Sequence, residues 1–264
     1  MLDGVRAQGR RDSRQAGAAG ELTGSTRPWQ FGDTEPWNTP RTVTNAVLRT
    51  SGTSPGGAVR LDVVDVEVSE TEQRTRAAVA LCVDTSWSMV QDGRWVPMKR
   101  TALALHHLIS TRFRGDALQI VTFGRHAEAV DVGELTALEG VWEQGTNLHH
   151  ALLLAGRHLR RHPDAQPVVL VVTDGEPTAH LEQDGEAVFH YPPLDRTLAR
   201  TVAEVDALSA LGASLTLFRL GDDPRLTAFI DRVARRSGGR VVAPDEDGLG
   251  AAVVGDYLRS RRRR

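Results

Sequence analysis

The spacing of apolar and polar residues predicts that strands and helices alternate from about residue 75 to residue 259. Two runs, 77–83 and 167–173, are apolar at nearly every position, as expected of strands buried on both faces of a parallel sheet. Further strands are expected at 117–123, 127–132, 214–220 and 240–243. Residues 61–68 also alternate, and we expect them to form a hairpin with the strand that begins at residue 75.

Between these strands, apolar residues recur at the spacing of amphipathic helices. Helices are predicted at 97–113, 135–142, 148–161, 198–211, 224–236 and 247–259. An alternation of this kind is typical of an α/β fold. We therefore predict an open, doubly wound, mostly parallel sheet that is flanked by helices and has one antiparallel edge strand.

The first 57 residues lack this pattern. Ala, Gly, Arg and Ser dominate up to Thr26, and so few bulky apolar residues cannot offset the entropy lost on ordering. A short helix is expected at 41–49, before a linker rich in Ser, Gly and Pro. We predict a disordered or loosely docked segment with its linker at 1–57, one domain at 58–259 and a basic tail at 260–264.

The net charge and the cysteine content of the chain argue against several classes of function. The net charge is −2, so nothing in the overall charge favours binding to nucleic acid or to a membrane surface. One cysteine, Cys82, excludes an internal disulfide framework and is expected to act as a small buried apolar residue. We find no apolar leader or membrane span in the sequence. The expectation is a cytoplasmic protein.

Oxygen-bearing side chains follow the two most apolar strands. Asp84, Ser86 and Ser88 come directly after the first, Asp174 comes directly after the second, and Thr146 precedes a predicted helix. Ligand sites of open α/β sheets lie at the carboxyl ends of the strands, so these side chains are expected at one edge. Carboxylates and hydroxyls suit Mg²⁺ better than zinc or copper. The alternative is that Asp84 and the serines only cap a turn.

The pattern Asp84-x-Ser86-x-Ser88 with Thr146 and Asp174 resembles the metal-ion-dependent adhesion site (MIDAS) of the von Willebrand factor A (vWA, integrin I-like) domain family, over about residues 60–259. The resemblance implies a Rossmann-like vWA fold and a Mg²⁺ ion, with Mn²⁺ or Ca²⁺ as alternatives. It implies that Ser86 and Ser88 bind the metal directly, Asp84 and Asp174 partly through water, and Thr146 in one state of the domain.

More narrowly, the sequence from Thr173 to Thr178 is similar to bacterial cytoplasmic members, which resemble the integrin-like domain of magnesium-chelatase subunits. That resemblance implies a non-enzymatic module that docks a Glu or Asp of a partner, such as a chelatase-like or MoxR-like AAA+ ATPase.

The loops around the predicted metal site supply candidate contacts to the partner. These candidates are Trp87, Gly145, Glu176 and His180. Trp87 is either an internal plug or an exposed anchor, and the loop that contains His180 is either a partner contact or a plain surface loop. The pairs His106-His107 and His149-His150 lie in predicted helices, where neighbouring side chains diverge, so we expect structural roles for them.

Two other functions remain open. A Mg²⁺-dependent phosphatase or phosphotransferase would use Asp84 as its nucleophile, but Ser86 stands where a second acid would be expected. An extracellular adhesin of the vWA type is the other alternative, although the sequence has no pair of cysteines for a disulfide. Turnover of a phosphate ester would favour the enzyme, whereas EDTA-sensitive capture of a protein would favour the binding module.

Overall fold

The computed structural model of the chain describes residues 21–33, 35–51, 59–72, 76–139, 144–245 and 247–261. It forms two compact units, Met1–Arg74 and Thr75–Arg264. We call them the N-terminal unit and the C-terminal unit, and each is described by itself. Within the described ranges, no helix is both long enough and apolar enough to cross a membrane.

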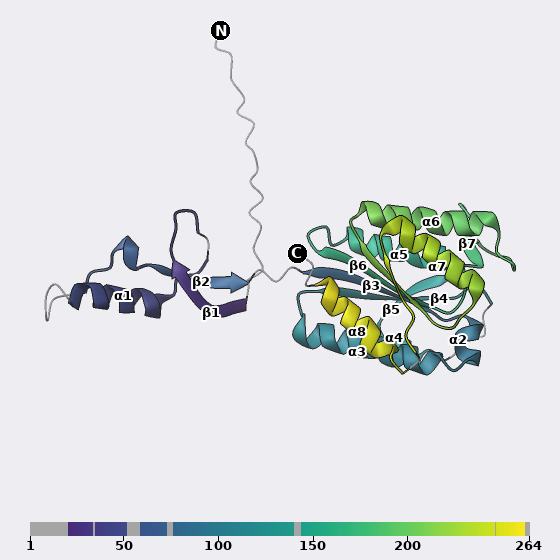
Figure 1. The fold of residues 1–264 in the computed structure, drawn as a ribbon, viewed down its shortest axis with the longest axis horizontal. Helices are drawn as coiled ribbons and strands as arrows, with labels where there is room; N and C mark the ends of the chain where they lie inside the picture. Colours follow the sequence, from purple (N-terminus) through teal and green to yellow (C-terminus); the bar gives the residue numbers. More distant parts are fainter. Residues whose placement is uncertain are drawn as a thin grey trace, which may run out of the picture. The chain divides into compact units, whose positions relative to one another are not determined.

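A six-stranded sheet forms the centre of the C-terminal unit (Figure 1). The strand order is β10-β9-β6-β3-β4-β5. Its strands are β3 (Ala77–Asp84), β4 (Ala117–Phe123), β5 (Ala127–Val130), β6 (Gln166–Thr173), β9 (Ser214–Arg219) and β10 (Arg240–Val242). Strand β3 pairs in parallel with both β4 and β6, while β5 pairs antiparallel to β4 at the edge. The predicted α/β sheet with one antiparallel edge strand is confirmed.

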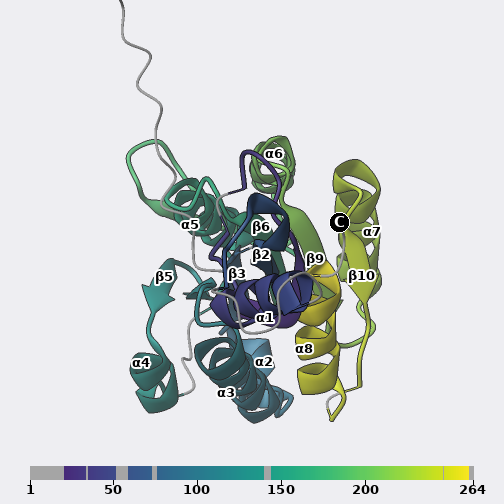
Figure 2. The same cartoon turned by 90° about the vertical axis from the view of Figure 1, so that its left-hand side faces the viewer.

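Helices cover both faces of this sheet. One face packs against α2 (Trp87–Gln91), α3 (Trp95–Arg112), α4 (Val132–Ala137) and α8 (Leu249–Ser260), and the other against α5 (Leu148–Arg160), α6 (Asp195–Ala210) and α7 (Pro224–Ser237). Figure 2 shows α3, α4 and α8 on the side opposite α5 and α6. Helix α2 was not predicted, and neither was the hairpin of β7 (Ala179–Leu181) and β8 (Ala187–Phe189) in the long connection after β6.

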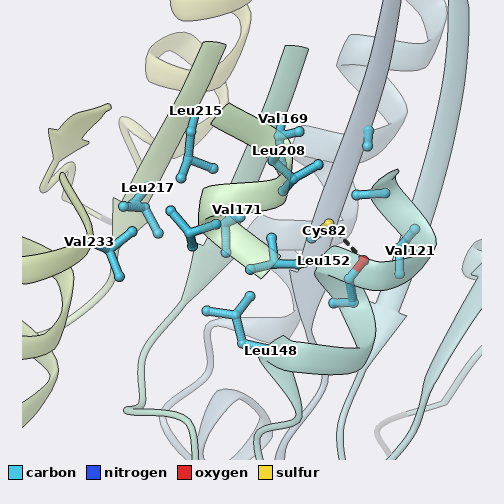
Figure 3. Close-up of a cluster of buried hydrophobic side chains, with 14 of the residues drawn as sticks. Cys82, Val121, Leu148, Leu152, Val169, Val171, Leu208, Leu215, Leu217 and Val233 are labelled. Carbon is cyan, nitrogen blue, oxygen red and sulfur yellow. Dashed lines mark hydrogen bonds between the residues drawn. The ribbon is translucent and has the colours of Figure 1, made fainter. Parts of the chain in front are cut away.

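The apolar sequence of β3 matches its central position. Ala80 and Cys82 face the cluster under α5, α6 and α7, whereas Leu81 and Val83 face the cluster under α3 and α8. Cys82 lies among the apolar side chains of Figure 3, with its Sγ 3.9 Å from the carbonyl oxygen of Ala151. Burial raises the pKa of the Cys82 thiol to about 12, so the prediction of a small buried apolar residue is confirmed.

The N-terminal unit differs from the prediction. It contains β1 (Glu21–Pro28), α1 (Thr39–Ser51), the 3₁₀ helix η1 (Val63–Asp65) and β2 (Glu67–Glu72). The predicted short helix exists as α1, and the described residues 21–33 and 35–51 also contain the strand β1. The remaining residues of the predicted segment at 1–20, 34 and 52–57 lie outside the described residues.

Strand pairing corrects a second expectation. Strand β2 pairs antiparallel with β1, and β3 pairs with β4 and β6, so the predicted hairpin between residues 61–68 and β3 is wrong. The division between the units falls at Arg74 and Thr75, not at residue 57. The apolar pattern missed β1 because its partner strand is far away in sequence and its residues are mostly polar.

The predicted basic tail also differs at its start. Helix α8 extends to Ser260, and the guanidinium of Arg261 donates to Asp116 at 2.6 Å. Asp116 also accepts from the hydroxyl of Tyr257 and from the backbone N–H of Ala77. These contacts fix the end of α8 against the start of β3. Residues 262–264 lie outside the described residues.

Candidate metal centre

Two buried carboxylates lie at the carboxyl edge of the sheet. Asp84 is the last residue of β3, and Asp174 follows the last residue of the neighbouring strand β6. Because β3 and β6 are parallel and adjacent, their carboxyl ends place the two acids side by side. Asp84 is fully buried and Asp174 is 8% exposed. Two neighbouring carboxylates that are shielded from water repel each other when charged, and a cation between or beside them would reduce that repulsion.

Both oxygens of Asp84 already accept hydrogen bonds. Its Oδ1 accepts from the backbone N–H of Ser86 at 2.9 Å, and its Oδ2 accepts from the hydroxyl of Thr173 at 2.6 Å. Burial raises the pKa of Asp84, and the charge of the neighbouring Asp174 raises it further. Thr173, which the sequence analysis did not single out, therefore fixes the orientation of Asp84.

The two serines connect this acid to Asp174. The hydroxyl of Ser88 donates to Oδ1 of Asp174 at 2.9 Å, and the hydroxyls of Ser86 and Ser88 lie 3.2 Å apart. Because Ser88 has one proton and gives it to Asp174, Ser86 is the donor between the serines. Ser86 lies at the N-cap position of α2, so the start of this short helix brings both hydroxyls to the acids.

Thr146 reaches the same edge from the loop before α5. Its backbone N–H donates to the hydroxyl of Thr178 at 2.9 Å, and its carbonyl accepts from the backbone N–H of Thr178 at 3.1 Å. A Cβ added at Gly175 would lie 3.5 Å from the Thr146 hydroxyl oxygen. The hydroxyl of Thr146 therefore lies beside the loop that carries Asp174, although no direct hydrogen bond joins the two side chains.

Gly145 shapes this loop. Its φ is +123°, and an added Cβ would lie 3.2 Å from the ring of Phe189. The positive φ favours glycine at this position, and the Phe189 ring leaves little room for a Cβ. Gly145 is also buried, so we assign it to the loop conformation that positions Thr146, in place of the predicted contact to a partner.

Arg94 is a member of the site that the sequence analysis missed. Its Nη1 donates to Oδ2 of Asp174 at 2.9 Å and lies 2.8 Å from Oδ2 of Asp92. Burial raises the pKa of Asp174, while the hydrogen bonds from Ser88 and Arg94 lower it in part. An arginine just before a helix gives no sequence signal that separates it from a surface residue.

The other predicted partner contacts differ in exposure. The Trp87 side chain, between the two serines, is 41% exposed. Glu176 is half-buried and lies 3.6 Å from the guanidinium of Arg225, and burial raises its pKa. Trp87 is therefore accessible at the rim of the site, and Glu176 is partly accessible.

His180 is not available to a partner, which corrects the prediction. Its ring is fully buried. Its Nδ1 lies 2.8 Å from the hydroxyl of Thr197, and its Nε2 lies 3.3 Å from Glu182. Strand β7 directs the ring onto α6, so a loop that looked polar and exposed in the sequence turns this side chain inward.

One of the two histidine pairs has a clear structural role. His149 accepts the backbone N–H of Leu181 at 3.2 Å, and His150 accepts that of Ala127 at 3.0 Å. Neighbouring histidines thus hold two different strands, as expected for side chains that diverge on a helix. Among the described residues, no group of three or more His, Cys, Asp and Glu side chains is arranged to hold a metal ion.

The donor set nevertheless fits a hard divalent cation. It comprises the carboxylates of Asp84 and Asp174 and the hydroxyls of Ser86, Ser88 and Thr146. Mg²⁺ is usually held by one or two carboxylates and keeps several waters. Two carboxylates are therefore enough for a Mg²⁺ site. Two buried acids with raised pKa values are also the groups that a cation would stabilise in their charged form.

Two family models match the chain. The model described as "Rv0959-like protein, vWA domain" matches residues 77–258, and "Rv0959-like protein, third domain" matches residues 21–71. The chain is 70% identical over 259 residues to the uncharacterized proteins Rv0959 of Mycobacterium tuberculosis (strain ATCC 25618 / H37Rv) and Mb0984 of Mycobacterium bovis. The match covers 97% of this chain and 38% of the length of each relative.

Solved structures agree on the fold. The von Willebrand factor type A protein from Catenulispora acidiphila has a TM-score of 0.53 and 18% identity, over 74% of this chain and 45% of that one. The vWF domain of the type V pili tip protein Mfa5 from Porphyromonas gingivalis has a TM-score of 0.55 and 12% identity, over 73% and 98%. The first family match spans well over half of the chain, which therefore belongs to the Rv0959-like proteins and carries their vWA domain in its C-terminal unit.

Proposed function

We propose that the C-terminal unit is a divalent-metal-dependent protein-binding module. The observation that carries this proposal is the connected set of oxygen donors at the carboxyl edge of the sheet, which runs from Ser86 through Ser88 to Asp174. It lies on a vWA fold, and vWA domains form a family of protein-interaction modules. Mg²⁺ is the preferred ion, and Mn²⁺ or Ca²⁺ are alternatives of the same hard character.

The partner supplies a carboxylate in this proposal. When bound, the cation attracts an incoming Glu or Asp, and the hydroxyl ligands leave its charge less neutralised than carboxylates would. Ser86 and Ser88 would hold the ion directly, Asp84 and Asp174 partly through water, and Thr146 in one state of the domain. Thr173 keeps Asp84 in place. Trp87 is the accessible aromatic side chain at the rim, and aromatic anchors often supply much of the binding free energy.

A non-enzymatic role agrees with the surroundings of Asp84. A nucleophilic carboxylate needs an oxygen that can approach the substrate. Asp84 is fully buried, and each of its oxygens accepts a hydrogen bond. This geometry favours binding over phosphoryl transfer.

The identity of the partner belongs to the same proposal. We infer a cytoplasmic AAA+ ATPase of the chelatase-like or MoxR-like type, on the resemblance of residues 173–178 to magnesium-chelatase subunits. The pilus proteins PilB and Mfa5 are 15% and 12% identical to this chain, so their likeness supports the vWA fold and no adhesive function.

Asp84→Ala tests the metal site. We expect the variant to remain folded, to lose Mg²⁺ binding in isothermal titration calorimetry, and to lose the protein that wild type captures from native lysate without EDTA. Asp84→Asn, which keeps the shape of the side chain, should behave in the same way. The control is Asp195→Ala, which removes an exposed acid and should bind as wild type does. Equal Mg²⁺ binding by Asp84→Ala, or a capture that EDTA does not change, contradicts the proposal.

A further inference from the structure

Arg94 stands where three loops of the C-terminal unit meet. It precedes α3, it donates to Asp174 after β6, and it lies against Gly221 after β9. A Cβ added at Gly221 would lie 3.0 Å from Nη2 of Arg94, and the φ of Gly221 is +82°. The chain thus leaves space at Gly221 for this guanidinium. With only 18% of its side chain exposed, Arg94 is held in place and does not extend into solvent.

The contact between Arg94 and Asp174 bears directly on metal binding, because Asp174 belongs to the candidate metal site. One oxygen of Asp174 accepts from Ser88, and the other accepts from Arg94. A buried carboxylate needs a positive charge nearby, because burial removes the water that would otherwise stabilise it. Arginine supplies that charge through a planar guanidinium whose geometry matches a carboxylate.

A divalent cation held by the same carboxylate would lie close to the guanidinium. Two like charges at short distance in a partly buried site repel strongly. The Arg94 side chain also has a second acid, Asp92, whose Oδ2 lies 2.8 Å away and whose side chain is 49% exposed. Arg94 can therefore release Asp174 and keep an ion pair at the rim.

We propose that Arg94 is a tethered counter-ion that competes with the divalent metal for Asp174 and so sets the metal concentration at which the site fills. Arg94 compensates Asp174 when little metal is present, which keeps the loops folded. Metal binding has to replace this contact, so partner binding requires a higher concentration of free metal than it would without Arg94. This inference rests on the metal site of the proposed function and adds a positioning residue that tunes it.

Calorimetric titration of the full chain with MgCl₂ tests the competition. Arg94→Gln removes the charge, and we expect it to bind Mg²⁺ at least about tenfold more tightly than wild type, or about 1.4 kcal/mol. Arg94→Lys keeps the charge and should stay within about threefold of wild type. Arg219→Gln is the matched control, because Arg219 is also 18% exposed but pairs with Asp222; its Mg²⁺ affinity should not change.

Thermal unfolding gives a second readout. In EDTA, Arg94→Gln should unfold at a lower temperature than wild type, and Mg²⁺ should raise its Tm by more than it raises that of wild type. If Arg94→Gln does not fold in EDTA, its recovery by Mg²⁺ during refolding supports the same competition.

The outcomes separate this inference from the proposed function. If wild type binds Mg²⁺ and Arg94→Gln binds it equally well or more weakly, the competition is refuted and the metal site stands. If neither wild type nor Arg94→Gln binds Mg²⁺, both proposals are refuted. Binding by Arg94→Gln alone supports the competition most directly.

Discussion

The two units of this chain are stabilised in different ways. In the C-terminal unit, the strands carry two apolar clusters, one on each face of the sheet. In the described part of the N-terminal unit, the buried apolar side chains are Ala46, Val66 and Val68. Larger apolar side chains there are exposed, among them Phe31 and Leu48. Burial of apolar surface explains the first unit and cannot by itself explain the second.

Polar contacts stabilise the N-terminal unit instead. Asp65 accepts two hydrogen bonds from the guanidinium of Arg49, at 2.8 and 2.7 Å. Asp33 accepts two from Arg27, at 2.6 and 2.8 Å. Glu67 accepts from the Thr26 hydroxyl across the two strands. Such paired contacts have fixed geometry, but they leave no periodic apolar pattern in the sequence. The polar sequence of the N-terminal unit is therefore ordered without a large apolar core.

The largest expected effect removes an apolar side chain from the C-terminal unit. Leu81 is fully buried at the centre of β3. Leu81→Ala should lower the free energy of unfolding of this unit by about 3–5 kcal/mol, because it deletes apolar contacts and leaves a cavity. Urea denaturation measures the loss, and hydrogen exchange read peptide by peptide assigns it to a unit. A loss below about 1 kcal/mol, or one confined to the N-terminal unit, would contradict the conclusion that apolar burial stabilises the C-terminal unit.

The pH dependence should also separate the units. Burial, together with the nearby charge of Arg200, lowers the pKa of His149 from an ordinary 6.5 to about 4. Between these values the unfolded chain binds a proton that the folded chain does not. Stability is therefore lost as the pH falls from 6.5 towards 4, by up to about 3 kcal/mol for this one group. Asp84 and Asp174, whose pKa values are raised, change stability in the opposite direction. The His149 contribution is therefore measured as the difference between wild type and a His149 variant, each denatured at a series of pH values.

His149→Gln is the control for that slope. Glutamine can still accept the backbone N–H of Leu181 but does not titrate, so the pH dependence between 6.5 and 4 should decrease. The N-terminal unit has no histidine. Its Asp33 and Asp65 have pKa values lowered mainly by hydrogen bonds from their arginines, so their contribution is lost only as the pH falls below 3.8. An unchanged slope in His149→Gln would contradict this account.

The smallest expected effects come from two neighbouring residues of α1. Leu48 is 68% exposed, and Leu48→Ala should change the stability of the N-terminal unit by no more than about 0.5 kcal/mol. Arg49→Gln removes the bidentate partner of Asp65 and should destabilise the unit more than Leu48→Ala does. Hydrogen exchange of α1 and β2 measures both. If Leu48→Ala is the more damaging change, Leu48 is buried in solution and apolar contacts matter more than the structure indicates.

The candidate site shows which parts of a site are readable from sequence. Asp84, Ser86, Ser88 and Asp174 were expected together and are joined by hydrogen bonds in the structure. They were predictable because each follows a strongly apolar strand, and parallel strands end at one edge. Thr146 lies beside them at Gly175.

The rest of the site depended on contacts that sequence does not record. Thr173 stands at the end of an apolar strand and was not singled out from the sequence, although its hydroxyl donates a hydrogen bond to Asp84. Arg94 follows a glycine and precedes a helix, like many surface arginines. His180 was expected at the rim, but β7 turns its ring inward onto Thr197. In all three cases the direction of a side chain decided its role.

The sequence by itself determined the α/β architecture of the C-terminal unit, its central strand β3 and the edge that carries the acids. It did so because burial on both faces requires a continuous apolar run and because parallel strands share a carboxyl edge. Only the tertiary structure decided the pairing of β1 with β2 and the contact between Arg94 and Asp174. Those features join residues 39 or more positions apart through polar contacts, whose partners are specified by geometry and not by any local pattern.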